Sequence, residues 1–179
     1  MLSYLKTIAN GQDDLAVRRI INVPKRGIGA TSITKVANYA AEHEMNFYSA
    51  LCEAAEIPGL GKAAAKIEPF VLFVQSMKAK SQLKPVSELL QEIIETTGYV
   101  RELEAEGTDE AEARIENIDE LISKAVDYEE AQEHPTLDGF LEEVALVADI
   151  DSLDADSDYV VLMTLHSAKG LEFPNVYLA

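Results

Sequence analysis

Apolar side chains recur three or four residues apart through most of the first 150 positions, a spacing that buries one face of an α-helix. In residues 62–80 this stripe comprises Ile67, Phe70, Val71, Val74 and Met77. The longest predicted helix, 108–132, carries acids on one face, which we interpret as a solvated surface. Its other face is apolar: Ala111, Ile115, Ile118, Leu121, Ile122, Ala125 and Tyr128. The pattern predicts a mainly α fold.

Capping residues, prolines and glycines divide this region into separate helices. The predicted helices cover 13–20, 31–43, 47–54, 62–80, 85–96, 108–132 and 137–148. The predicted N-caps are Asp13 or Asp14, Thr31 or Ser32, Asn46 and Thr136. Gly98 is expected to end the helix that begins at Pro85.

The pattern changes after residue 148. Residues 149–158 contain five aspartates and few apolar side chains, which predicts a flexible acidic linker. Residues 159–163 are continuously apolar and rich in β-formers, as in a strand buried on both faces, and 175–179 resemble a second strand. Two such strands cannot form a stable sheet alone, so we expect a short C-terminal β stub from a larger α/β domain.

Composition bears on the cellular compartment of the protein and on the partners that it can have. The only cysteine, Cys52, cannot form an internal disulfide, which favours a reducing, cytoplasmic location, and its helical surroundings predict a core position. No run of 18 apolar residues exists, and residues 1–4 do not begin a signal peptide. No membrane partner is therefore expected. No metal site is expected either.

The net charge of −17 is unevenly distributed. Residues 1–100 hold 11 Lys and Arg against 10 Asp and Glu, whereas residues 101–179 hold 4 against 22. A phosphate-binding patch in the first half is therefore compatible with an acidic protein, provided that it is small and local.

Residues 22–32, NVPKRGIGATS, lie between two predicted helices and carry the chemistry of a phosphate site. Two glycines permit a tight turn, and the isoleucine between them can fill the groove between the helices. The predicted backbone-binding residues are Lys25, Arg26, Gly27, Ile28, Gly29, Thr31 and Ser32. The alternative is a plain turn with two incidental cations. Residues 58–62, PGLGK, form a second turn of this kind, either a further phosphate contact or a simple connection.

Residues 164–173, TLHSAKGLEF, follow the predicted buried strand, where α/β sheets bind ligands. Lys169 can meet a phosphate, Gly170 permits close backbone approach, Glu172 can accept from a ribose hydroxyl, and His166 can switch hydrogen bonds with ligand state. The alternative is a polar loop with a satisfied histidine.

This decapeptide resembles motif V of superfamily 1 DNA helicases of the UvrD/PcrA/Rep type. The hairpin at 23–29 resembles the Gly-Ile-Gly hairpin of the 2B accessory domain of that family, and the likeness extends over the chain, including 116–120. The resemblance implies a nucleotide site at Lys169, Gly170 and Glu172, and coupling of that site to single-stranded DNA through Thr164 and His166.

The resemblance also implies a division of the chain. Residues 1–10 would end a 2A-like segment, 11–150 would form a helical 2B-like accessory domain, 151–158 a linker, and 159–179 a 2A-like strand-loop-strand stub from a RecA-like domain. The parent would be an ATP- and Mg-dependent 3′ to 5′ DNA helicase, with the rest of the motor and repair or replication proteins as partners.

The sequence lacks a Gly-x-x-x-x-Gly-Lys-Ser/Thr loop and the other motor motifs that hold Mg·ATP. We therefore expect no catalytic residue, no bound cofactor and no activity in these 179 residues alone. The alternative function is a helical protein-interaction or autoregulatory domain that uses its acidic half. A nuclease relative is disfavoured, because no acids have metal-ligand spacing.

Overall fold

The computed structural model describes the backbone of residues 1–151 and 175–177, with side chains through residue 146 and at 175–177. The predicted strand at 159–163, the motif at 164–173 and most of the acidic linker lie outside the described residues. Residues 175–177, which belong to the second predicted strand, are not in a strand. The chain divides into two compact units, 1–141 and 142–179.

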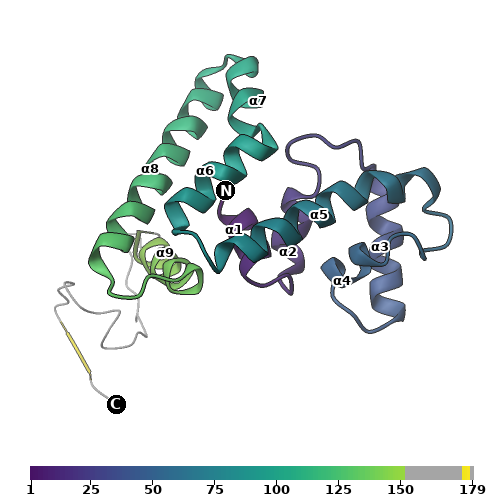
Figure 1. Ribbon diagram of the computed structural model, residues 1–179, viewed down its shortest axis with the longest axis horizontal. Helices are drawn as coiled ribbons and strands as arrows, with labels where there is room; N and C mark the ends of the chain where they lie inside the picture. Colours follow the sequence, from purple (N-terminus) through teal and green to yellow (C-terminus); the bar gives the residue numbers. More distant parts are fainter. Residues whose placement is uncertain (152–174, 178–179) are drawn as a thin grey trace. The chain divides into compact units, whose positions relative to one another are not determined.

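Helices dominate the described residues, which confirms the mainly α prediction (Figure 1). In chain order they are α1 (Leu2–Ala9), α2 (Asp14–Ile20), α3 (Ala30–Glu42), α4 (Phe47–Cys52), the short η1 (Gly61–Ala63), α5 (Ala64–Ser81), α6 (Val86–Thr97), α7 (Tyr99–Glu106), α8 (Asp109–Ala131) and α9 (Leu137–Asp151).

Helix α5 runs through the first unit and contacts α1, α4 and α6. Its predicted stripe is confirmed, because Ile67, Phe70, Val71, Val74 and Met77 are all buried. Helix α1 packs on both α2 and α5, with Tyr4 edge-on to Phe73 at a ring-centroid distance of 5.8 Å. The first nine residues therefore belong to this helical core.

Helices α6, α7 and α8 pack against one another in the same unit, with α7 and α8 side by side across a short loop (Figure 1). Leu103, Ala111 and Ile118 form the centre of this contact. The Glu129 carboxylate, on α8, accepts hydrogen bonds from the Ser87 amide and hydroxyl, both at 2.7 Å. It therefore caps the start of α6 from another helix.

Most predicted helix starts are confirmed. Asp13 accepts from the Ala16 amide, Asn46 from the Ser49 amide, and Thr136 from the Gly139 amide. Gly98 ends α6 with a left-handed φ of 68°.

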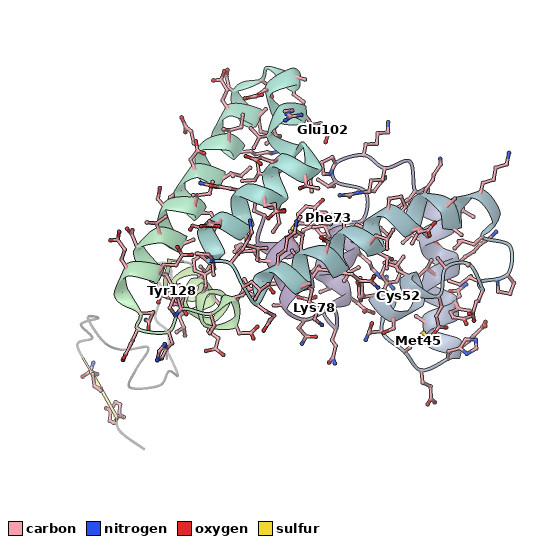
Figure 2. The ribbon with its side chains drawn as sticks, viewed as in Figure 1. Met45, Cys52, Phe73, Lys78, Glu102 and Tyr128 are labelled. Atoms are coloured by element: carbon pink, nitrogen blue, oxygen red, sulfur yellow. The ribbon has the colours of Figure 1, made fainter. Side chains whose placement is uncertain are left out.

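Four details differ from prediction. The cap assigned to Thr31 or Ser32 is wrong, because Gly29 is the N-cap and α3 begins at Ala30. Helix α9 continues to Asp151, so the linker does not begin at 149. Cys52 is exposed at the end of α4, since the face of that helix turned inward carries Phe47, Ala50 and Leu51 (Figure 2). Helices α1 and α7 had not been predicted.

The second unit, 142–179, contains the later part of α9, on which Leu146 is 40% exposed. Within the part of the chain that the structure describes, no helix is both long enough and apolar enough to cross a membrane.

Candidate nucleic-acid interface

The first hairpin, residues 21–29, connects α2 to α3 and is organised by Asn22. The Asn22 Oδ1 atom accepts from the Arg26 amide at 2.9 Å and from the Ile28 amide at 3.3 Å. Gly27 adopts a φ of 68°, a conformation that side chains other than glycine rarely tolerate. Ile28 is 1% exposed, so the predicted burial of this side chain is confirmed, and its place in the groove between the helices stays a prediction.

Arg26 points into the hairpin and holds its backbone. Its Nη1 donates to the carbonyls of Ile20 at 2.7 Å and Ile21 at 3.2 Å, and its Nη2 donates to the Tyr4 hydroxyl at 2.6 Å. The guanidinium also lies 5.2 Å from the centroid of the Phe70 ring. Its predicted phosphate contact stays a prediction, and this part of the guanidinium already has partners inside the protein.

Tyr4 joins α1 to the hairpin. Its hydroxyl donates to the Val23 carbonyl at 2.7 Å while accepting from Arg26. Burial raises the pKa of Tyr4 above its usual range, and the hydrogen bond from Arg26 offsets only part of that effect. The phenol therefore stays protonated and keeps its donor role. The sequence carries no local signal for this contact, since 19 residues separate Tyr4 from Val23.

The other predicted residues of the hairpin face outward. Lys25, Gly27, Gly29 and Thr31 are exposed, and Ser32 is half-buried in the first turn of α3. Among the described residues, the Lys25 ammonium makes neither an ion pair nor a hydrogen bond. This segment thus carries an exposed cation and exposed glycine backbone on the turn, followed by a hydroxyl in the first turn of α3.

The second hairpin, residues 57–61, connects α4 to η1 and α5 and also has a buried aliphatic residue between two glycines, but Gly29 of the first hairpin has a φ of −72°. Gly59 and Gly61 have φ values of 74° and 53°, and Leu60 between them is 5% exposed. Lys35, on α3, donates to the Gly59 carbonyl at 2.6 Å. Lys66, on α5, donates in turn to the Gly27 carbonyl of the first hairpin at 3.1 Å. These two lysines are site residues that the sequence reasoning missed.

The chain around the two hairpins has a positive charge. Residues 15–41 contain five Lys and Arg and no acid, and residues 57–67 contain Lys62 and Lys66 and no acid. In a protein of net charge −17, both hairpins thus lie in stretches whose charged side chains are all Lys or Arg, bounded by Asp14, Glu42, Glu56 and Glu68.

The motif residues Thr164, His166, Lys169, Gly170 and Glu172 lie outside the described residues. Their nucleotide and DNA contacts stay predictions. Within the described ranges, no cluster of three or more His, Cys, Asp or Glu residues is placed to hold a metal ion.

The described residues form a helical module with two glycine-rich hairpins that carry or adjoin exposed lysines. The chain belongs to the family described as the UvrD-like helicase C-terminal domain, which it matches over residues 1–179. This confirms the UvrD-type resemblance that the sequence indicated.

Curated relatives agree with this assignment. The ATP-dependent DNA helicase PcrA of Bacillus subtilis (strain 168) is 42% identical over 184 residues, covering 99% of this chain and 25% of the relative. The protein of the same name from Staphylococcus aureus (strain Mu50) is 44% identical over 180 residues, covering 99% and 24%. The chain thus spans about a quarter of the length of the curated relatives that it matches.

Proposed function

We propose that this chain is the duplex-contacting part of an ATP-dependent 3′ to 5′ DNA helicase, and that its first hairpin binds the phosphate backbone of duplex DNA. The observation that carries the proposal is the outward set of Lys25, Gly27, Gly29 and Thr31 on a turn fixed from within by Asn22 and Arg26. Such a turn offers a cation, accessible backbone and a hydroxyl to a phosphate but no side chain to read a base edge.

Family membership supports the DNA partner, since the relatives are named as DNA helicases. In the intact motor, the nucleotide would be ATP with Mg, held in part by Lys169, Gly170 and Glu172. Thr164 and His166 would link that site to the single strand. The 179 residues carry no phosphate-binding loop of the motor type, so we propose that they do not turn over ATP alone.

Lys25→Gln tests the proposal more cleanly than any substitution of Arg26, because Arg26 also supports the turn. Binding of the 179-residue chain to a labelled duplex would be followed by fluorescence anisotropy from low to moderate salt. Loss of one phosphate contact should weaken binding and reduce the slope of log K against log salt by about 1, whatever the DNA sequence.

Lys78→Gln is the matched control, because Lys78 is an exposed lysine near the far end of α5 from the hairpins (Figure 2). It should leave the salt slope unchanged. Equal effects of the two substitutions, or no duplex binding by the wild-type chain at low salt, would overturn the proposed contact. The alternative function, a helical protein-interaction domain that uses its acidic half, would then be preferred.

A further inference from the structure

A surface hollow of about 360 Å³ lies where the start of α1 and the last turn of α2 meet α7 and α8. The start of α1 reaches α8 here, because Met1 packs against the cluster of Leu103, Ala111 and Ile118. The apolar part of the lining is Met1, Leu2, Ile118 and Leu121. Five polar side chains from the four helices complete it: Ser3, Arg19, Tyr99, Arg114 and Asn117.

Each of these five polar side chains can donate a hydrogen bond, and no carboxylate of the described residues lines the hollow. The lining contrasts with the sequence around it, because residues 101–179 hold 22 Asp and Glu against 4 Lys and Arg. A larger hollow, at the α5–α6 and α8–α9 turns, has a mixed lining that includes Lys84, Glu129 and Asp138. The lack of acids therefore distinguishes the smaller hollow, and it favours an anionic ligand.

Arg19 supplies one positive charge of the hollow. Among residues 1–146 and 175–177, its guanidinium makes neither an ion pair nor a hydrogen bond. The Met1 ammonium lies close enough to respond to it, since burial and then the like charge of Arg19 lower the pKa of that amine. Arg19 therefore contributes a positive potential to the hollow that no neighbouring carboxylate of these residues neutralises.

Arg114 supplies a second guanidinium, from α8. Its Nη2 atom lies 2.7 Å from the Glu110 carboxylate, and the side chain remains 49% exposed. A guanidinium has five N–H donors, so this ion pair leaves donors for a ligand. Two guanidinium groups with hydroxyl and amide donors beside them suit the several acceptor oxygens of a phosphate better than the two oxygens of a carboxylate.

The exposed acids of α8 restrict the size of the anion. Glu112, Glu116, Asp119 and Glu120 are all exposed near the α8 residues that line the hollow. A nucleic-acid strand carries a charge at every phosphate, so it would bring several like charges against these carboxylates. A compact anion places its charge at the guanidinium groups alone, and acids more than about 8 Å away are largely screened at physiological ionic strength.

We propose that this hollow binds the phosphate group of a small molecule through Arg19 and Arg114. The phosphate is either free or carried by a mononucleotide, for which the apolar lining of Leu2, Ile118 and Leu121 offers a surface beside the phosphate. The site is separate from both hairpins, and the proposal does not rest on duplex binding through Lys25.

Inorganic phosphate is the first probe, titrated at constant ionic strength into the isotope-labelled 179-residue chain and followed by NMR. The side-chain amide of Asn117 should shift and saturate. Arg19→Gln and Arg114→Gln should each weaken binding about tenfold, because each removes a charge-assisted hydrogen bond. Lys124→Gln is the matched control, since Lys124 pairs with Glu120 on α8 but does not line the hollow, and it should bind like wild type. The spectrum of each variant verifies that the fold is retained.

AMP and a short single-stranded oligothymidylate distinguish the sources of phosphate. Tighter binding of AMP than of phosphate identifies a mononucleotide as the ligand, and equal binding identifies free phosphate; either result supports the site. The oligothymidylate should leave the Asn117 signal unshifted.

The proposal is overturned if phosphate causes no saturable shift, if both arginine variants bind like Lys124→Gln, or if the oligothymidylate occupies the hollow more tightly than phosphate and AMP. None of these measurements uses duplex DNA or Lys25. Failure of the phosphate site is therefore distinguishable from failure of the proposed function.

Discussion

Arg26→Ala is expected to destabilise the protein rather than act only on DNA binding. The guanidinium makes two short hydrogen bonds, to the Ile20 carbonyl at 2.7 Å and to the Tyr4 hydroxyl at 2.6 Å. Hydrogen bonds to charged groups contribute about 1.5 kcal/mol each at the low end of their range, which suits a half-buried site. The face of the Phe70 ring adds about 0.5–1 kcal/mol. Together these contacts predict a loss of about 3.5–4 kcal/mol.

Urea denaturation followed by far-UV circular dichroism measures this loss. With a slope near 2 kcal/mol per molar urea, the unfolding midpoint of Arg26→Ala should fall by about 1.5–2 M. Arg26→Lys should lose about half as much free energy, because a lysine keeps the charge but a single ammonium cannot span both acceptors. Arg101→Ala, at an exposed arginine on α7, is the matched control and should change stability by less than about 0.5 kcal/mol.

The reasoning about Arg26 is refuted if Arg26→Ala unfolds at the wild-type midpoint yet loses duplex affinity. That result would mean that the guanidinium is available to phosphate and that its internal contacts contribute little.

Two further predictions concern helix α6. Glu129→Ala should lower the free energy of unfolding, measured by urea denaturation, by about 1–2 kcal/mol, because it removes the carboxylate that accepts from the Ser87 amide and hydroxyl. Glu130→Ala, at the neighbouring exposed acid, is the control and should leave the free energy of unfolding almost unchanged. Equal losses in the two variants would contradict the capping role. Hydrogen bonds from Lys80 and Lys84 hold the pKa of the Glu92 carboxyl below its usual range. The ion pairs of Glu92 therefore stabilise the fold at pH values above its unfolded-state pKa. This stabilisation is lost as the pH falls through the lowered pKa of the folded state. Glu92→Gln should therefore be less stable than wild type at pH 7 and equal to it at the acid end of a pH series, and a constant difference would contradict this.

Periodicity was sufficient to predict the helices whose apolar stripe is long and regular. The stripe of α5 from Ile67 to Met77 and the burial of Ala111, Ile118, Ala125 and Tyr128 on α8 both agree with the sequence pattern. Helices α1 and α7 have only eight residues each, too few turns to establish a period against their neighbours. Capping residues located Asp13 and Asn46 because an Asx side chain bonds its own helix within three residues.

The candidate site was predictable only in its local part. The turn at Gly27 and the burial of Ile28 follow from the residues themselves. The inward direction of the Arg26 side chain depends on its hydrogen bond to Tyr4, 22 residues away. The hydrogen bond from the Lys66 ammonium to the Gly27 carbonyl spans 39 residues. Contacts of this range depend on how the helices pack, which a single sequence does not encode in any short pattern. The second Gly-apolar-Gly sequence, at 59–61, was the one feature of the sequence that pointed to the second hairpin.

The contact of Tyr4 with Val23 and Arg26 also has a mechanical meaning. A displacement of α1 would act on the first hairpin directly through the Tyr4 hydroxyl, in addition to the packing of α1 on α2 and α5. Load borne by α1 would therefore be converted into a displacement of the loop that carries Lys25.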